Sequence, residues 1–503
     1  MAFFNGDERE FVEAVSALTF CNPFLPERMA FERRILGGDA VDMGPVWSKR
    51  ADFAGETPNV LAIQERSEQA LATFRSRLAE SAEPSAEEWD LYVDLVSYVL
   101  YYRYQKPFLD RIAEESGADS FPFYSDFADD LRHFLETGTT GTRPVTPEES
   151  AHWFACFFQV RRAFYQTFRF ILGASPAAAR LRGAVWQSIF THDMKRYRRS
   201  LHRHMGDVSV LITGESGTGK EIVARAIGRS RYIPFDPSRR RFAASWRETF
   251  FPLNLSALSA TLIESELFGH RKGAFTGATE DHAGWLEVCG QHGTVFLDEV
   301  GETAPEIQVK LLRLLEDRRY ARLGDTRQRV FAGKVIAATN RDLPEEMASG
   351  RFRGDLYYRL CADTIHTPPL REQVADQPSE LRNLVLFLAG RVAGDDEQEA
   401  LADEVMSCIR NDLGLDYPWP GNVRELEQCV RNVMIRRCYT PAASPHDPDA
   451  FWNDVKAGTL PADELLRRYC TLVYNLTGSY EAAGRRLGLD RRTVKAKVDG
   501  ELL

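Results

Sequence analysis

The sequence predicts an α/β core in the middle of the chain, with helical domains before and after it. From Val208 to about Arg437, short apolar runs with the character of buried strands alternate with amphipathic segments of helical spacing. This alternation is typical of a parallel sheet. The run Val208–Ile212 leads into a glycine-rich loop and then into Ile222–Ile227, which has helical character. We therefore expect an α/β core with a parallel sheet and a phosphate-binding loop.

Length and composition indicate a multidomain globular protein. The 503 residues are enough for two to four domains, and 44% hydrophobic with 27% charged residues is ordinary for soluble proteins. Residues 1–10 lack the basic start and apolar centre of a signal peptide, and no run of about 20 apolar residues predicts a membrane span. The eight cysteines form no C-x-x-C pair. A cytoplasmic location with reduced thiols is expected.

The net charge of −10 is unevenly distributed. Residues 1–150 carry 28 acidic and 14 basic side chains, a net charge of −14. The remainder carries +4. The acidity belongs to the first domain, so the total charge does not argue against nucleic-acid binding by the rest of the chain.

Residues 1–172 are predicted to form a mostly helical domain. Apolar residues recur at helical spacing in Glu8–Leu18, Val60–Ala79, Ala86–Tyr104 and Glu148–Leu172. The last of these segments is rich in aromatic residues, from Trp153 to Phe170. Such a stripe is more typical of a core than of a ligand pocket, although a ligand or partner site stays open. Residues 1–172 show no β-α alternation that opens with an acidic cluster, which argues against a phosphoacceptor receiver domain.

A domain junction is expected at Gly173–Pro176, because serine followed by proline suits a helix start. The helix Ala177–Ile189 follows and leads to the basic run Lys195–Arg199. That run is interpreted as a solvated helix face, with an intersubunit or nucleotide-edge contact as the alternative.

The glycine-rich loop after the first strand has the pattern of a phosphate-binding loop. Its glycines let backbone N–H groups surround phosphate oxygens, and the lysine and the helix N-terminus add positive charge. A glutamate stands where the general motif has serine or threonine as a magnesium ligand, so the metal must be held from elsewhere. The loop consists of Gly214, Glu215, Ser216, Gly217, Thr218, Gly219, Lys220 and Glu221.

Two further strands end in polar residues suited to nucleotide hydrolysis. The strand Thr294–Leu297 is followed by Asp298 and Glu299, a Walker B arrangement. Asp298 is the candidate Mg²⁺ ligand, and Glu299 is the candidate residue that polarises the attacking water. The strand Lys334–Asn340 ends in polar residues at the same edge of the sheet, where Asn340 or Thr339 could touch the γ-phosphate or the attacking water.

The segment Gly273–Ala278 (Gly273, Ala274, Phe275, Thr276, Gly277 and Ala278) is predicted to be a mobile loop. Two glycines bracket small residues and one phenylalanine, so Phe275 is expected at an exposed tip that forms a contact surface.

These motifs resemble the central AAA+ domain of bacterial sigma-54-dependent transcription activators, the enhancer-binding proteins. The resemblance covers about residues 173–437, roughly half of the chain. Gly273–Ala278 spells GAFTGA, and the glutamate after Lys220 is the form that this family uses. The other matching motifs are Ser265–His270, Phe296–Glu299, Ala338–Asn340, Pro368–Glu372 and Trp419–Leu426.

The resemblance implies a role for each matching residue. Lys220 would contact ATP phosphates, and Asn254 would restrain Glu299 until nucleotide and partner are in place. Arg353 and Arg359 would be fingers that reach the nucleotide of an adjacent subunit. The second sensor, in a helical lid at about 372–437, would be Arg424. Phe275 and Thr276 would touch sigma-54, and the ring is usually a hexamer.

The last part of the chain is predicted to be a helix-turn-helix DNA-binding domain, residues 461–503, after a linker at 438–460. Ser479 would cap one helix, Gly488 would make the turn and Asp490 would cap the next helix. The unit resembles the Fis-like domain that ends this family, and Gly484 stands where alanine is usual. The residues expected to face DNA are Arg491, Arg492, Thr493, Lys495 and Lys497.

Taken together, the sequence predicts an ATP-dependent activator that binds upstream double-stranded DNA, forms a ring and remodels the closed sigma-54 RNA polymerase complex into the open complex. The alternative is a nucleotide-binding and DNA-binding regulator, such as a repressor, without remodelling activity. An unfoldase or helicase is not favoured, since no pore loop or partner domain for it is evident.

Overall fold

The computed structural model describes residues 3–42, 57–80, 83–114, 120–136, 144–441, 455, 458 and 460–498. It forms two compact units, Met1–Arg437 and Cys438–Leu503. The predicted linker at 438–460 and the last five residues fall largely outside this description. Within the described residues, no helix combines the length and the apolar character that a membrane crossing requires.

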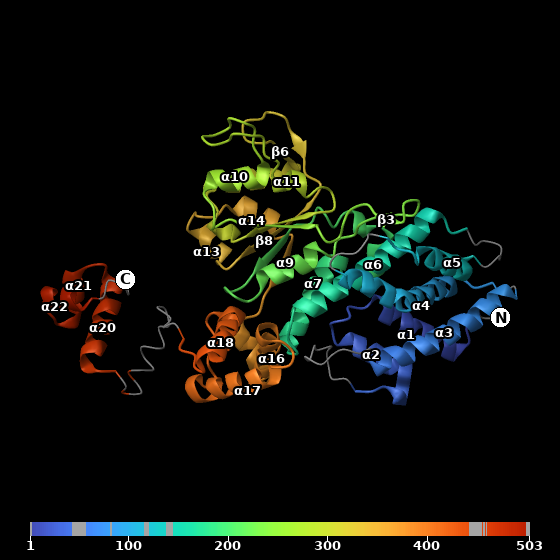
Figure 1. Cartoon of the computed structure of the whole chain (residues 1–503), viewed down its shortest axis with the longest axis horizontal. Helices are drawn as coiled ribbons and strands as arrows, with labels where there is room; N and C mark the ends of the chain where they lie inside the picture. Colours follow the sequence, from blue (N-terminus) through green and yellow to red (C-terminus); the bar gives the residue numbers. More distant parts are fainter. Residues whose placement is uncertain are drawn as a thin grey trace. The chain divides into compact units, whose positions relative to one another are not determined.

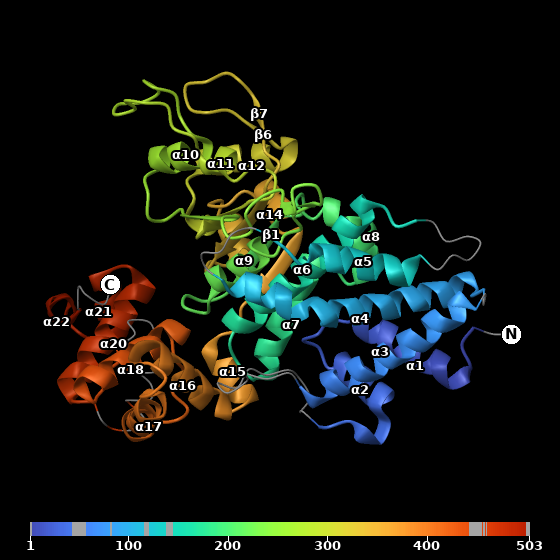
Figure 2. The same cartoon turned by 45° about the vertical axis from the view of Figure 1, so that its right-hand side comes forward.

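The N-terminal region is a helical bundle, as predicted (Figures 1 and 2). Asn5, Ser85 and Thr146 start three of its helices with capping boxes, which satisfy backbone N–H groups at the helix ends. Aromatic side chains fill the interior, with Phe108 and Phe154 fully buried. The helices are α1 (Gly6–Phe20), α2 (Glu27–Leu36), α3 (Pro58–Ala79), α4 (Ala86–Ala113), α5 (Tyr124–Leu135) and α6 (Pro147–Phe170).

A five-stranded parallel sheet forms the centre of the first unit, in the order β4-β5-β8-β1-β9. The three central strands, β5, β8 and β1, are mostly buried and largely apolar, as expected when helices cover both faces of a parallel sheet, whereas the edge strands β4 and β9 are partly exposed. The strands are β1 (Val210–Thr213), β4 (Phe250–Asn254), β5 (Thr294–Asp298), β8 (Lys334–Thr339) and β9 (Asp363–His366).

Alternate residues of the strands point to opposite faces, and each face has its own core. Leu211 and Leu297 pack in a cluster with α10 (Ala260–Phe268), α12 (Pro305–Asp317) and α14 (Gly354–Leu360). Ile212 and Phe296 pack in a second cluster with α7 (Pro176–Phe190) and α9 (Lys220–Gly228). The smaller helices of this region are α11 (Trp285–Val288) and α13 (Leu343–Ala348), and β6 (Arg319–Tyr320) pairs with β7 (Arg329–Val330) in a separate two-stranded sheet.

The predicted helical lid follows the sheet and begins at Leu370. It is drawn in orange in Figure 1. Its helices are α15 (Leu370–Asp376), α16 (Ser379–Ala393), α17 (Gln398–Cys408) with a π-helical end at Ile409–Leu413, and α18 (Asn422–Arg436).

The basic run Lys195–Arg199 is neither simply solvated nor a nucleotide contact, and both interpretations from sequence were incomplete. It forms α8 (Met194–Arg199), which packs against the N-terminal bundle. Lys195 pairs with the buried Asp94 of α4. The Arg198 guanidinium donates to Ser97 Oγ at 2.6 Å and lies 4.3 Å from the ring centroid of Trp153. Lys195, Arg196 and Arg199 are exposed, as was expected of the whole run, whereas Tyr197 is buried and Arg198 is half-buried.

The segment Tyr232–Phe251 attaches the N-terminal bundle to the core. It contains a short hairpin, β2 (Phe235–Asp236) paired with β3 (Arg241–Phe242). Phe235, Phe242 and Trp246 are buried in the aromatic core of the bundle. Burial of each such side chain contributes about 1.5–3 kcal/mol. The three arginines at 239–241 form an exposed tip, so the basic character of the segment belongs to its surface alone.

The second unit contains α20 (Ala462–Thr477), α21 (Tyr480–Leu487) and α22 (Arg491–Lys497) around a small core that includes Val473, Ala483 and Val494. Asp490 caps α22 by accepting from Arg492 N, as predicted. Ser479 stands before α21, but its side chain makes no cap hydrogen bond. Gly484 has a packing role, because a Cβ at this position would lie 2.8 Å from Leu489 O. Only glycine allows the turn at Leu489 to pack this closely against α21.

Candidate nucleotide site and interaction surfaces

The predicted nucleotide-site residues gather at one edge of the sheet. Strand β1 ends at Thr213 before the phosphate-binding loop, β4 ends at Asn254, and β5 ends at Asp298. Strand β8 ends at Thr339, just before Asn340. Ligands of open α/β sheets bind outside the carboxyl ends of the strands, so this edge is the candidate site.

The phosphate-binding loop depends on glycine at positions that other residues could not occupy. Gly214 has φ +148°, and a Cβ on it would lie 2.1 Å from Thr367 Oγ1. Gly217 has φ +79°, and a Cβ there would lie 2.3 Å from Gly421 O. Both the backbone conformation and the close packing exclude a side chain. The loop is therefore held in shape by β9 and by the lid.

Lys220 begins α9 at the base of this loop and is 7% exposed. Its Nζ donates to the carbonyl oxygens of Gly214 (2.9 Å) and Glu215 (3.1 Å). Burial lowers the pKa of Lys220, while Glu299 and Asp298 oppose that shift. The cation is thus held inside the loop and next to both acids.

Asp298 and Glu299 are adjacent but differently placed. Asp298 is half-buried at the end of β5, and its burial, reinforced by the charge of Glu299, raises its pKa. An acid whose charged form is disfavoured in this way is stabilised by a cation, such as Lys220 or a metal ion. Glu299 adopts the left-handed conformation (φ +55°), which costs about 1–3 kcal/mol for a residue with a side chain. The turn directs its carboxylate toward β8.

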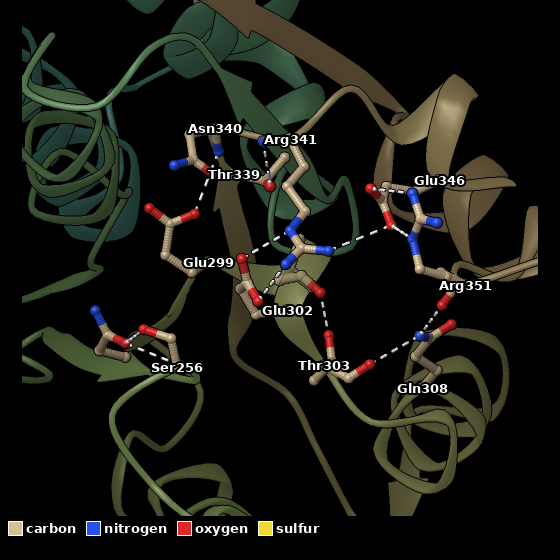
Figure 3. Close-up of polar contacts among 12 residues, drawn as sticks. Ser256, Glu299, Glu302, Thr303, Gln308, Thr339, Asn340, Arg341, Glu346 and Arg351 are labelled. Carbon is tan, nitrogen blue, oxygen red and sulfur yellow. Dashed lines mark hydrogen bonds and ion pairs between the residues drawn. The ribbon is translucent and has the colours of Figure 1, made fainter. Parts of the chain in front are cut away.

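Glu299 accepts a hydrogen bond from the Asn340 backbone N–H at 3.2 Å, as Figure 3 shows. The predicted restraint by Asn254 is not formed among the described residues. Asn254 Oδ1 instead accepts from Ser256 N and Ala257 N, which closes the turn after β4. Asn254 is the register partner of Asp298 in the pairing of β4 with β5, so the Asn254 side chain starts next to the acid pair Asp298 and Glu299.

The lid contacts the phosphate-binding loop through residues whose roles the sequence did not reveal. Glu215 forms a two-pronged ion pair with Arg371 of α15 at 2.8 and 2.5 Å, and Arg371 holds the pKa of Glu215 low. The fully buried Asn422 donates to Glu215 Oε2 and Ser216 O. Arg424, the predicted second sensor, donates to Ser216 Oγ at 3.2 Å. The matching motifs around 368–372 and 419–426 indicated this region, but the partners became evident only in the fold.

A polar network extends from the acid pair toward the predicted fingers (Figure 3). Arg341, next to Asn340, forms a two-pronged pair with Glu302 at 2.7 and 2.6 Å. Arg341 also reaches Glu346 at 3.4 Å, and Glu346 pairs with Arg351 at 2.6 Å. The buried Gln308 donates to Arg351 O and accepts from Arg353 N. The hydrolysis edge and Arg353 are therefore linked within one chain.

Arg353 and Arg359 lie at the two ends of α14, exposed, away from the phosphate-binding loop. Arg353 pairs with Asp355 at 2.7 Å, and Arg359 reaches Glu316 at 3.4 Å. Among the residues that the structure describes, neither forms a hydrogen bond or ion pair with Lys220, Asp298 or Glu299 of its own chain. This placement is compatible with action on a neighbouring subunit.

The Gly273–Ala278 loop is a compact turn rather than an extended tip. Gly273 N donates to Ala278 O at 2.8 Å, and Ala278 N donates to Phe275 O at 3.1 Å. Phe275 is half-buried and packs edge-on against His270, with ring centroids 5.0 Å apart. The prediction of a fully exposed Phe275 was therefore wrong, because the loop folds back on its own base. Thr276 is exposed at the outer end.

The basic surface of the C-terminal unit lies on α22. Arg491, Arg492, Thr493 and Lys495 are exposed, whereas Val494 faces the core. Lys497 differs from the other predicted DNA-facing residues, because its ammonium pairs with Asp463 of α20.

The chain fits a nucleotide with a divalent cation. The loop offers backbone N–H groups in a cradle that a Cβ would fill, with a buried lysine at its base. Asp298 has a raised pKa and lies beside Lys220, so it is a suitable single carboxylate ligand for Mg²⁺, which takes one or two carboxylates together with substrate phosphates.

Comparison with known proteins identifies a matching family model and several similar proteins. Residues 189–366 match the family model described as the sigma-54 interaction domain. The transcriptional regulatory protein ZraR of Klebsiella oxytoca is 39% identical over 309 residues, which is 58% of this chain and 63% of that protein. The Nif-specific regulatory protein of Azotobacter vinelandii is 44% identical over 227 residues, 45% of this chain and 40% of that protein.

The DNA-binding transcriptional regulator NtrC of Azospirillum brasilense is 43% identical over 241 residues, 48% of this chain and 46% of that protein. The chain thus spans about half the length of the curated relatives that it matches. Among solved structures, NtrX from Brucella abortus in complex with ATP is 25% identical, with 69% of this chain and 72% of that chain covered and a TM-score of 0.40.

Proposed function

We propose that this chain, whose residues 189–366 belong to the sigma-54 interaction domain family, is an ATP-dependent activator of sigma-54 RNA polymerase. It would bind upstream DNA, assemble into a ring and use ATP hydrolysis to open the closed promoter complex. The observation that carries the proposal is the joint presence of a complete nucleotide edge and an exposed Thr276 on the family's GAFTGA loop.

Hydrolysis would use this chain's residues in separate roles. Lys220 and the loop N–H groups bind and orient the phosphates, and Asp298 holds Mg²⁺, which supplies charge neutralisation when it is bound. Glu299 orients the attacking water and accepts its proton. Its present hydrogen bond from Asn340 N keeps it at the sheet edge. Arg424 joins the lid to the loop through Ser216.

The Glu302–Arg341–Glu346–Arg351 network supports a coupling between neighbouring sites. It begins next to Asn340 and ends next to Arg353, which is exposed on α14. A movement of Asn340 or Glu299 in one subunit would therefore change the position of the arginine that this subunit supplies to the adjacent nucleotide site. We propose Arg353 and Arg359 as these arginines, because arginine stabilises charge on a transferring phosphoryl group.

The action of Arg353 on a neighbour is tested by mixing two inactive variants. Arg353→Ala keeps its own nucleotide site, and Lys220→Ala keeps its own Arg353. Each alone is expected to lose ATP turnover, Arg353→Ala by roughly 10³-fold or more. Mixing them should restore part of the turnover, measured as phosphate release, because one subunit then supplies the arginine and the other the site. No recovery in mixed rings would show that Arg353 acts within its own chain.

DNA recognition by α22 gives a second test, with a matched control on the same helix. Arg492→Ala removes an exposed cation and should weaken binding to the chain's own DNA site by about 1–3 kcal/mol. Lys497→Ala should change it by less than about 0.5 kcal/mol, because Lys497 is already paired with Asp463. Fluorescence anisotropy at fixed salt measures both. Equal losses would contradict the proposed orientation of α22.

A repressor without remodelling activity is the less favoured function. Such a protein needs neither Glu299 at the sheet edge nor an exposed Thr276 on a folded GAFTGA loop, and this chain has both.

A further inference from the structure

A partly open cavity of about 570 Å³, which the proposed activity does not use, lies at the N-terminal bundle. It lies between α1, α2, α4, α6, α7 and α8, so most of its walls come from the domain without an assigned role. Pockets for small organic molecules usually measure about 300–1,000 Å³. The cavity is within this range.

Aromatic side chains form a large part of the wall. They include Phe20 from α1, Tyr101 and Tyr102 from α4, Phe157 and Phe164 from α6, and Phe190 from α7. The aromatic stripe that the sequence predicted as core is therefore both core and cavity wall. An apolar wall of this kind favours a ligand with an aromatic or aliphatic body.

Several wall residues bury polar atoms that meet no hydrogen-bond partner among the described residues. These atoms are Gln159 Oε1, Trp186 Nε1 and Arg161 Nε. Gln159 and Trp186 are only 1% and 3% exposed. An unsatisfied buried polar group costs about 1–3 kcal/mol, so a site that keeps several of them is suited to a ligand that satisfies them.

The charges at the wall favour an anion. Five basic side chains line the cavity, against the two acids Glu32 and Asp110. Glu32 is already paired with Arg28 at 2.7 Å. In the described structure, Arg161 and Arg198 form no ion pair with a carboxylate. Arg161 instead lies 5.7 Å from the ring centroid of Phe164. Guanidinium groups on aromatic faces are suited to carboxylate recognition.

We propose that this cavity is a binding site for small organic carboxylates with an aromatic or otherwise apolar body. The body packs against the aromatic wall, and the carboxylate is bound by Arg161 and Arg198. Both arginines lie on helices that surround the cavity, Arg161 on α6 and Arg198 on α8.

The cavity wall is joined directly to the nucleotide-binding helix. Gln159 Nε2 donates to Ser230 O at 2.9 Å. Arg162, one turn further along α6, donates to Arg231 O. Ser230 and Arg231 follow the end of α9, the helix that begins at Lys220. A ligand that reorients Gln159 therefore changes the support of α9. This regulatory half of the inference rests on the proposed ATPase function.

Binding is tested by titration calorimetry on the full chain without nucleotide, using 2-naphthoate and its uncharged counterpart 2-naphthamide. Saturable binding of 2-naphthoate with a Kd of about 1 mM or tighter is expected, and binding of 2-naphthamide about tenfold weaker or worse. No saturable heat with 2-naphthoate would overturn the proposal. Equal affinity for the two probes would overturn the anion site.

Two variants locate the site. Arg161→Gln should weaken 2-naphthoate binding about tenfold or more, while Arg196→Gln, on the exposed side of α8, should not. Leu109→Trp fills the cavity and should prevent binding, whereas Leu61→Trp, which adds the same bulk at an exposed position of α3, should not. Thermal unfolding shows whether Leu109→Trp folds. If it does not fold, the binding of 2-naphthoate to Arg161→Gln tests the location of the site. Unchanged binding in Arg161→Gln would contradict the site.

The same samples then test coupling. Saturating 2-naphthoate should change the ATPase rate of the full chain but not that of Arg161→Gln. An unchanged rate despite binding would refute the coupling. A chain without any ATPase activity would refute the proposed function and leave the calorimetric result intact.

Discussion

Lys220→Ala in the full chain is expected to abolish ATP turnover. Lys220 is the only buried cation among the side chains of the phosphate-binding loop as described, and its Nζ lies at the base of that loop. Loss of one member of a buried charge pair costs about 2–5 kcal/mol, which corresponds to roughly 30- to 4,000-fold weaker phosphate binding. Phosphate release and binding of a fluorescent ATP analogue both measure the effect.

Lys310→Ala is the matched control. Lys310 lies on α12, is half-exposed and pairs with Glu264, so its removal should leave turnover within about twofold, as for most exposed residues. Normal turnover in Lys220→Ala would remove the basis for the nucleotide site.

Thr276→Ala is expected to separate ATP hydrolysis from promoter opening. Thr276 is exposed, and the hydrogen bonds that shape its loop run between backbone atoms of Gly273, Phe275 and Ala278. The substitution should therefore leave the loop folded and the ATPase rate within about twofold, since exposed changes of this kind cost little. Permanganate footprinting on a sigma-54 promoter should show no melted DNA.

Thr279→Ala provides the control for that experiment. Thr279 is also exposed and follows the loop by one residue, so both ATPase activity and promoter opening should persist. Retained opening in Thr276→Ala would mean that the loop does not deliver the work of hydrolysis to the polymerase.

The core and its nucleotide edge could be predicted because their signals are local. Strand, glycine loop, lysine and helix are contiguous in sequence, and the carboxyl ends of parallel strands must meet at one edge. Gly214, Lys220, Asp298 and Asn340 therefore occupy the expected edge. Arg371 and Asn422 could not be assigned roles, since their partner Glu215 is more than 150 positions away.

The errors arose where tertiary packing decides exposure. Arg198 belongs to a run that resembles a solvated helix face, but it is half-buried against the N-terminal bundle, and the exposed Lys195 pairs with the buried Asp94. Phe275 between glycines suggests an exposed tip, but His270 packs against it. In the sequence, the hairpin at 235–242 is marked by its three consecutive arginines. Its phenylalanines and Trp246 were the available signal that it is buried against another domain.

The most direct test of the central proposal is promoter opening by the full chain and sigma-54 RNA polymerase with different nucleotides. With ATP, the full chain should produce melted promoter DNA in a permanganate footprint. A non-hydrolysable ATP analogue should produce none. ATP turnover without melting, or melting with the analogue, would contradict an activator that couples hydrolysis to opening.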